Sequence, residues 1–173
     1  MRILGIDPGL GITGYGLIDR SGFRVIEAGV IRTRANTPIE NRIRKIFDEI
    51  ADIVEEHKPE VLVLEKIYSH YKHPTTSILM GHTRAMACLI CGKFKVKLIN
   101  YPSTRIKKVV TGNGHASKIQ VQRMVQNILR LKTAPEPKDV SDALAMAICY
   151  CYTEGSRGKG SGSGGDDDLA HNG

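Results

Sequence analysis

Four acidic side chains could do chemistry together, because each lies at the end of a predicted strand or near the start of a predicted helix. They are Asp7, Glu65, Asp139 and Asp142. Oxygen ligands without His or Cys suit Mg²⁺ or Mn²⁺. Clustered carboxylates repel one another, and divalent cations relieve that repulsion. Because two such ions can promote hydrolysis of a phosphodiester bond, the four acids predict a metal-dependent nuclease site.

Two short aliphatic runs each end in one of these acids. Residues 3–6 precede Asp7, and residues 61–64 precede Glu65. Continuous hydrophobicity is typical of buried parallel strands. If the two strands pair in parallel, their acids emerge at the same edge of the sheet. The Asp-Pro-Gly sequence that begins at Asp7 could instead be a simple turn, which suits that tripeptide.

The other two acids lie near the start of a helix predicted from about Pro137 to Tyr152. Asp139 and Asp142 are three residues apart and therefore share one face of that helix. The positive end of the helix dipole favours ionised carboxylates in the first turns. Asp139 alone could be an ordinary helix-end acid, whereas Asp142 lies deeper on the same face.

The elements between these acids predict an α/β domain. Residues 13–19 and 23–33 favour two strands that form an antiparallel meander with the first strand. Thr37, Pro38 and Glu40 predict the start of a helix, as its cap, its first residue and the partner in a capping box. The remaining predicted elements are a helix at 76–91, a strand at 95–100, a helix at 103–110 and a helix from the capping box of Ser117 and Gln120 to Leu131.

The middle of the chain is basic and free of acids. Between Lys66 and Pro135 there are thirteen Lys or Arg residues and no Asp or Glu, in a chain of 173 residues with a formal net charge of +7. A solvated basic face usually interleaves acids for solubility. The pattern therefore favours a polyanionic partner, with nucleic acid as the first candidate, over a merely solvated surface.

The composition of the chain further limits the class of protein to which it can belong. A hydrophobic content of 41% supports one domain with a core. No apolar run approaches the ~18 residues of a membrane helix, and no signal peptide is evident. Residues 1–153 are expected to form the domain, and the Gly/Ser/Asp-rich residues 154–173 a flexible tail.

The four cysteines do not predict a zinc site. They are Cys88, Cys91, Cys149 and Cys151. Cys88 and Cys91 have zinc-like spacing, but a second ligand pair at such spacing is missing. All four are therefore predicted to be small buried hydrophobic residues in a reducing compartment, the cytoplasm.

Four motifs follow one another along the chain. They are GIDPGLGITGYG at 5–16, LEKIY at 64–68, VVTGNGHASKIQVQRMV at 109–125 and KDVSDALAMAICY at 138–150. Over about residues 1–152 the chain resembles the RuvC family, bacterial crossover junction endodeoxyribonucleases of the ribonuclease-H-like fold. The resemblance implies a five-stranded mixed sheet of order 3-2-1-4-5. It also implies that Asp7, Glu65, Asp139 and Asp142 are catalytic acids that bind two Mg²⁺ ions, with Mn²⁺ as a substitute.

The same resemblance implies partners and contacts. The family forms a homodimer through the helix at 76–91 and nicks two opposed strands of a four-way Holliday junction, in recombination and repair. The RuvA–RuvB branch-migration complex would be a further partner. Many members have Gln and Phe where this chain has Lys66 and Tyr68. The expected DNA-binding residues are Tyr68, which would contact junction bases, together with Lys72, Arg105, Lys107, Lys108, His115 and Lys118, although each could be an ordinary surface side chain.

Three other functions remain open. A nuclease of the same fold that acts on structured RNA would differ in its substrate. A phosphotransferase of the actin and sugar-kinase kind shares a D-x-G-x-x-x-T-G loop, but a second phosphate loop and an adenosine motif are missing, and the chain is short for two lobes. A junction-binding protein with an inactive site is disfavoured because all four acids are present.

Overall fold

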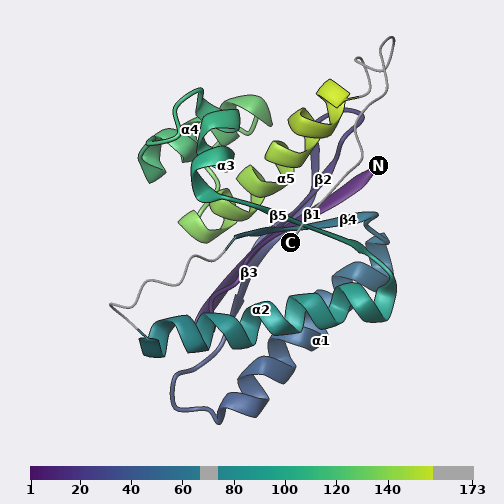
Figure 1. Cartoon of the computed structure of the whole chain (residues 1–173), viewed down its shortest axis with the longest axis vertical. Helices are drawn as coiled ribbons and strands as arrows, with labels where there is room; N and C mark the ends of the chain where they lie inside the picture. Colours follow the sequence, from purple (N-terminus) through teal and green to yellow (C-terminus); the bar gives the residue numbers. More distant parts are fainter. Residues whose placement is uncertain (67–73, 158–173) are drawn as a thin grey trace, which may run out of the picture.

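The structure is a computed structural model that describes residues 1–66 and 74–157, with side chains described within 1–66 and 78–154. Its strands are β1 (Arg2–Asp7), β2 (Ile12–Asp19), β3 (Arg24–Arg32), β4 (Val61–Glu65) and β5 (Lys97–Tyr101). Its helices are α1 (Ile39–His57), α2 (Pro74–Phe94), α3 (Ser103–Thr111), α4 (Lys118–Ile128) and α5 (Lys138–Arg157). Figure 1 shows the sheet as a central layer, with α1 and α2 on one side and α3, α4 and α5 on the other.

The strands form one mixed sheet in the order β3-β2-β1-β4-β5, so the predicted class and strand order are confirmed. Strands β1, β2 and β3 are antiparallel, whereas β1, β4 and β5 run parallel. Ile6 of β1 lies opposite Leu64 of β4. The acids that follow these two residues therefore lie at the same edge of the sheet.

Side chains of β1 and β4 alternate between the two faces of the sheet. Those that pack with α1 and α2 are Leu4, Ile6, Leu62 and Leu64, and those that pack with α5 are Ile3, Val61 and Val63. Asp7 and Glu65 continue the odd-numbered series, so both carboxylates lie on the α5 face.

Helix α5 lies close to the sheet because glycines line its path across β1 and β2. A Cβ atom on Gly5 would clash with the backbone oxygen of Ala143. A Cβ atom on Gly16 would come within 2.6 Å of the Leu144 side chain. Because glycine has no side chain, the backbone of α5 can come close to the sheet. This brings the first turns of α5 beside β1.

The start of α1 differs from the prediction. The helix begins at Ile39, and its N-cap is Pro38, with no side-chain hydrogen bond to the cap. Thr37 instead lies in a turn, where its N–H donates to the carbonyl of Arg34 (3.1 Å). The carbonyl of Pro38 accepts the first helical bonds, including one from Asn41 N–H (3.1 Å). The predicted cap at Thr37 and the predicted first helical position of Pro38 are therefore wrong.

Two later helices follow the prediction with different ends. The capping box of α4 is confirmed, because Ser117 Oγ accepts from Gln120 N–H and the Gln120 side chain accepts from Ser117 N–H. That helix ends at Ile128, three residues before the predicted end. Helix α5 continues to Arg157 and so crosses the expected domain boundary at residue 153. The limits of the domain stay a prediction, since residues 158–173 lie outside the described part.

The burial of the cysteines was predicted correctly at three positions of four. Cys91, Cys149 and Cys151 are buried, whereas Cys88 is exposed. Cys88 precedes Leu89, which is also exposed, so both lie on the side of α2 that faces away from the sheet. Within 1–66 and 74–157, the structure contains no helix long and apolar enough to cross a membrane.

Candidate active site

The acids at the carboxyl edge of β1 and β4 line a cavity of about 200 Å³, here called the acid cavity. Its polar lining consists of Asp7, Glu65, Ser103, Lys107, Lys118 and Asp142. Strand β1, strand β4 and helix α5 each supply one carboxylate. Asp7 is therefore more than a turn residue, and three of the four predicted acids lie together.

The fourth acid, Asp139, lies beside the acid cavity but does not line it. It is above Gly14 of β2, where an added Cβ would come within 2.9 Å of the Asp139 Cβ. Gly14 in turn faces Asp7 across the ladder between β1 and β2. Asp139 is close enough for its negative charge to raise the pKa of Asp7.

Asp7 is the most strongly perturbed of the four acids. Its pKa is raised from 3.8 to about 7, mainly by burial and further by the negative charges of Asp142 and Asp139. The ammonium group of Lys118 lowers this pKa and so acts in the opposite direction. A carboxylate that is this costly to ionise is well suited to a cation that would neutralise it.

The pKa of Glu65 is also raised by burial, but a hydrogen bond partly offsets this effect. Burial raises the pKa of Glu65, while a hydrogen bond from the Ser103 hydroxyl lowers it. The charge of Asp142 raises this pKa further, and those of Lys107 and Lys118 lower it. Ser103 begins α3 and is separated from the end of β5 by Pro102 alone, so a third parallel strand end contributes to the acid cavity.

Lys118 forms the ion pair that partly neutralises these acids. Its Nζ lies 2.9 Å from Asp142 Oδ2, and the hydrogen bond to Asp142 is the main cause that raises the pKa of Lys118. Lys118 is the first residue of α4, directly after the capping residue Ser117. The predicted capping box therefore positions a basic side chain at the acid cavity.

The donor set of the acid cavity fits a hard divalent cation better than a soft one. Its acidic lining consists of Asp7, Glu65 and Asp142, without Cys or His. Among the described residues, no three His, Cys, Asp or Glu side chains are already close enough together to ligate one ion. At Asp142 a cation would compete with the ammonium group of Lys118.

The predicted DNA-binding residues fall into three groups. Lys107 and Lys118 line the acid cavity. Three others do not line it: Lys108 and His115 are exposed, and the guanidinium carbon of Arg105 lies 5.0 Å from the centre of the Tyr101 ring. Tyr68 and Lys72 lie outside the described residues.

Sequence reasoning missed two polar side chains at this edge. One is Ser103, whose only signal is its position at the start of a helix that closely follows a strand. The other is Arg84, which approaches from the α2 face. Its Nη1 donates to the backbone carbonyl of Glu65 (2.7 Å), and its Nη2 donates to the side-chain oxygen of Asn100. Nothing in the local sequence distinguishes Arg84 from other basic residues on a helix.

A mixed sheet of order 3-2-1-4-5 with acids at its carboxyl edge defines the ribonuclease-H-like class. The fowlpox virus Holliday junction resolvase shares this fold, with a TM-score of 0.53 at 14% identity over 88% of this chain and 99% of that one. The Thermus thermophilus RuvC structure matches with a TM-score of 0.82 and 27% identity, over 90% of this chain and 97% of that one.

Sequence comparison narrows the class to one family. A family model described as crossover junction endodeoxyribonuclease RuvC matches residues 3–150. A crossover junction endodeoxyribonuclease RuvC from Rhodopirellula baltica is 46% identical over 145 residues, which are 83% of this chain and 82% of the relative. A second, from Thermomicrobium roseum, is 37% identical over 146 residues, 84% of this chain and 89% of the relative. The chain therefore belongs to the RuvC family, and the resemblance of the motifs is confirmed.

Proposed function

We propose that this protein is a metal-dependent endonuclease that nicks four-way DNA junctions at the acid cavity. The observation that carries the proposal is the meeting of three carboxylates and two lysines, from β1, β4 and three helices, in one cavity. Support also comes from the relatives named crossover junction endodeoxyribonuclease. A Thermus thermophilus RuvC, 26% identical to this chain, has been solved in complex with a Holliday junction substrate.

The four acids are the residues that would hold the metal. Asp7, Glu65 and Asp142 line the acid cavity, and Asp139 lies beside it, so together they can provide oxygen ligands for two Mg²⁺ ions, with Mn²⁺ as a substitute. When bound, the ions would supply stabilisation of negative charge on the attacking and leaving oxygens of the phosphodiester. The contribution of Asp7 is an ionised carboxylate, which its raised pKa makes dependent on a neighbouring cation.

The basic residues would hold the nucleic acid against this negative site. Lys107 and Lys118 lie at the acid cavity, where they can bind the scissile phosphate or its neighbour. Lys118 would exchange Asp142 for a phosphate oxygen once the acids are neutralised. The more distant contacts to junction DNA are assigned to Tyr68, which would stack on a base, and to Lys72, Arg105, Lys108 and His115.

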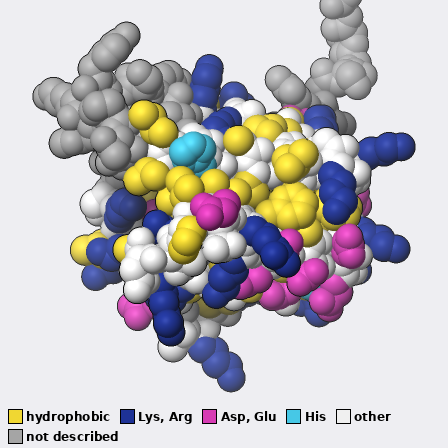
Figure 2. Space-filling view, turned by 90° about the horizontal axis from the view of Figure 1, so that it is seen from below, with side chains coloured by type: hydrophobic (Ala, Val, Ile, Leu, Met, Phe, Trp, Pro, Cys, Tyr) yellow, Lys and Arg dark blue, Asp and Glu magenta, His cyan; other side chains and the backbone are white. Residues whose placement is uncertain are grey.

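A homodimer would place two such sites on opposed strands of one junction. Between α1 and α2 lies an apolar groove of about 580 Å³ whose lining includes Phe47, Met86 and Leu89. Leu89 is 61% exposed, as is Ile78 of the same helix. Figure 2 shows hydrophobic side chains gathered on this face between charged ones. A second copy of the chain is the occupant that the proposal assigns to this groove.

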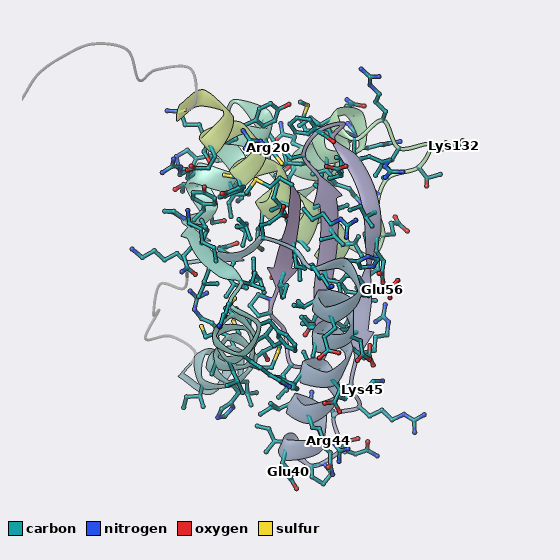
Figure 3. The ribbon with its side chains drawn as sticks, turned by 90° about the vertical axis from the view of Figure 1, so that its right-hand side faces the viewer. Arg20, Glu40, Arg44, Lys45, Glu56 and Lys132 are labelled. Carbon is teal, nitrogen blue, oxygen red and sulfur yellow. The ribbon has the colours of Figure 1, made fainter. Side chains whose placement is uncertain are left out.

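Two charged side chains of α1, Glu40 and Arg44, line the groove. Figure 3 shows Glu40, Arg44 and Lys45 near the start of α1, on the outside of the molecule. Two of these residues form ion pairs within the helix, Arg44 with Asp48 (3.4 Å) and Lys45 with Glu49 (3.6 Å).

The proposal also includes a cellular role. The protein would act in recombination and repair in the cytoplasm, with a RuvA–RuvB complex as partner.

The experiment compares a mobile four-way junction with a linear duplex of matched sequence, each incubated with the purified protein and Mg²⁺. Denaturing gels should show symmetric nicks in the junction alone. Asp7→Asn should abolish the nicks, because a ligand of the metal is lost, while a native gel still shows the bound junction. If the wild-type protein binds the junction but does not cleave it in Mg²⁺ or in Mn²⁺, the proposed nuclease activity is contradicted. If it cleaves structured RNA and not the junction, the proposed substrate changes from junction DNA to RNA.

A further inference from the structure

Arg84 joins helix α2 to the ends of two neighbouring strands. One guanidinium nitrogen donates to the carbonyl of Glu65, the last residue of β4, over 2.7 Å. The other donates to the side-chain oxygen of Asn100 in β5. A planar guanidinium can make both bonds at once, whereas an ammonium group has no such fork. Both acceptors are uncharged, so the two bonds fix geometry without neutralising an acid.

Strand β4 ends at the point that Arg84 contacts. Glu65 is the last residue of β4 that pairs with β5, opposite Tyr101. The N–H of Lys66, the residue after the strand, donates to the Tyr101 carbonyl (2.8 Å). The peptide group that follows Glu65 therefore forms hydrogen bonds with the Tyr101 carbonyl and with Arg84.

Glu65 is thus held from both faces of the sheet. Its side chain lies on the α5 face, in the acid cavity, where the Ser103 hydroxyl donates a hydrogen bond to it. Its backbone carbonyl is held from the α2 face by Arg84. Rotation of the Glu65 backbone would carry the carboxylate away from Asp7 and Asp142, and both contacts oppose that rotation.

We infer that Arg84 is a positioning residue for Glu65, because it fixes the end of β4 and thereby the place of the Glu65 carboxylate in the acid cavity. The assignment rests on the proposed function, since it concerns a carboxylate proposed to bind metal. Side chains that orient metal ligands from behind typically change metal affinity or activity by about 10- to 100-fold when removed. Arg84 does so through the backbone of the ligand and never touches the substrate.

The test compares Arg84→Ala, Arg84→Lys and Asn100→Ala in the full chain. Metal binding is measured without DNA, as the rise in melting temperature over a Mn²⁺ titration. Cleavage of a four-way junction is measured over a Mg²⁺ titration, and junction affinity is measured in Ca²⁺. Arg123→Ala is the matched control, because it removes one exposed positive charge from α4.

Arg84→Ala should raise the Mn²⁺ concentration at half-maximal shift by about tenfold and lower kcat by about 10- to 100-fold. Junction affinity should stay within about twofold of that of Arg123→Ala. Arg84→Lys should recover part of the metal response, because one donor can still reach the Glu65 carbonyl. Asn100→Ala should show a smaller loss of the same kind, and it serves as the probe should Arg84→Ala fail to fold.

Two results would overturn the assignment while leaving the proposed function intact. If Arg84→Ala lowers the melting temperature but leaves the metal response unchanged, Arg84 only connects α2 to the sheet. Weaker junction binding with unchanged kcat and metal response would make it a DNA contact. If the wild-type protein itself shows neither a Mn²⁺ response nor cleavage, the proposed function fails, and this assignment fails with it.

Discussion

The backbone of Asp139 rests directly on Gly14, with no room for a side chain between them. Gly14 faces Asp7 in the ladder between β1 and β2. This contact brings an acid of the last helix beside the acid of the first strand, although 131 positions separate them in the sequence. The arrangement of the candidate site therefore depends on Gly14, a residue that has no side chain.

Gly14→Ala should destabilise the protein and disturb the acid cavity together. The new Cβ would overlap the Asp139 carbonyl, so α5 must move away from the sheet, at a cost of about 1–3 kcal/mol in the free energy of unfolding. Urea denaturation and a Mn²⁺ titration of the melting temperature measure the two effects. Gly11→Ala is the matched control, because a Cβ there meets nothing within 4 Å. Equal stability of the two variants would contradict the packing described for α5.

Asp7→Asn should stabilise the protein when divalent cations are removed. The folded-state pKa of Asp7 is about 7, above its ordinary value of 3.8, so the folded protein holds this proton more tightly than the unfolded chain does. Its contribution to stability is fully present below about pH 4 and is lost as the pH rises through 7. At pH 8 in EDTA the variant should gain up to about 4 kcal/mol, since the shift is about three pKa units and each unit corresponds to about 1.4 kcal/mol.

The measurement for this prediction is the difference in unfolding free energy between wild type and Asp7→Asn at several pH values. Other titrating groups are common to both proteins, so the difference isolates Asp7. It should widen from pH 4 to pH 7 and then level off. A difference that does not change with pH would show that Asp7 titrates normally in the folded state.

Lys118→Met should strengthen divalent-cation binding while it impairs cleavage. Its ammonium lies 2.9 Å from Asp142 Oδ2 and competes with a cation for that carboxylate. Removal of a partly exposed ion pair should tighten Mn²⁺ binding by roughly twofold to fivefold, as read from the titration of melting temperature. The comparison is Lys107→Met. Lys107 also lines the acid cavity, but it forms no such ion pair with Asp142 among the described contacts. Weaker Mn²⁺ binding in Lys118→Met would mean that the lysine organises the carboxylates.

Leu89→Glu should convert a dimer into monomers without unfolding them. Leu89 lines the apolar groove and is 61% exposed, so the single chain loses little packing when it is replaced. Sedimentation velocity gives the oligomeric state, and circular dichroism checks the fold. The matched control is Ile119→Glu, because Ile119 is 52% exposed on α4, on the other side of the sheet. A wild-type protein that sediments as a monomer at high concentration would remove the dimer from the proposed function.

The sequence was sufficient to predict the sheet order and the edge at which the acids meet. The aliphatic runs before Asp7 and Glu65 and the glycines at 9–16 carry local signals for strand and turn, and the family motifs supply the strand order. The predicted cap at Thr37 was wrong, because the identity of a capping residue does not determine whether the chain turns before or after it. Exposure of Cys88 was missed, because α2 is apolar on more than one side.

The face on which each acid lies follows from the alternation of side chains along β1 and β4, which sequence analysis did not use. Arg84 could not be predicted, because its two acceptors come from β4 and β5 and only the packing of α2 brings them together. The near contact between Lys118 and Asp142 has the same origin. Such contacts depend on tertiary structure, whereas the acids themselves carry a local signal at the end of each strand.

The alternation along β1 and β4 makes chain length, more than residue identity, the critical property of these strands. Between Ile3 and Asp7, one aliphatic side chain can replace another of similar volume with a modest loss of packing. Deletion of one residue there would shift every later side chain to the opposite face and would turn Asp7 into the aliphatic layer beneath α1 and α2. Libraries with in-frame single-residue deletions should therefore lose folded protein at β1 and β4, while they retain it at the exposed turn around Ser21 and Gly22.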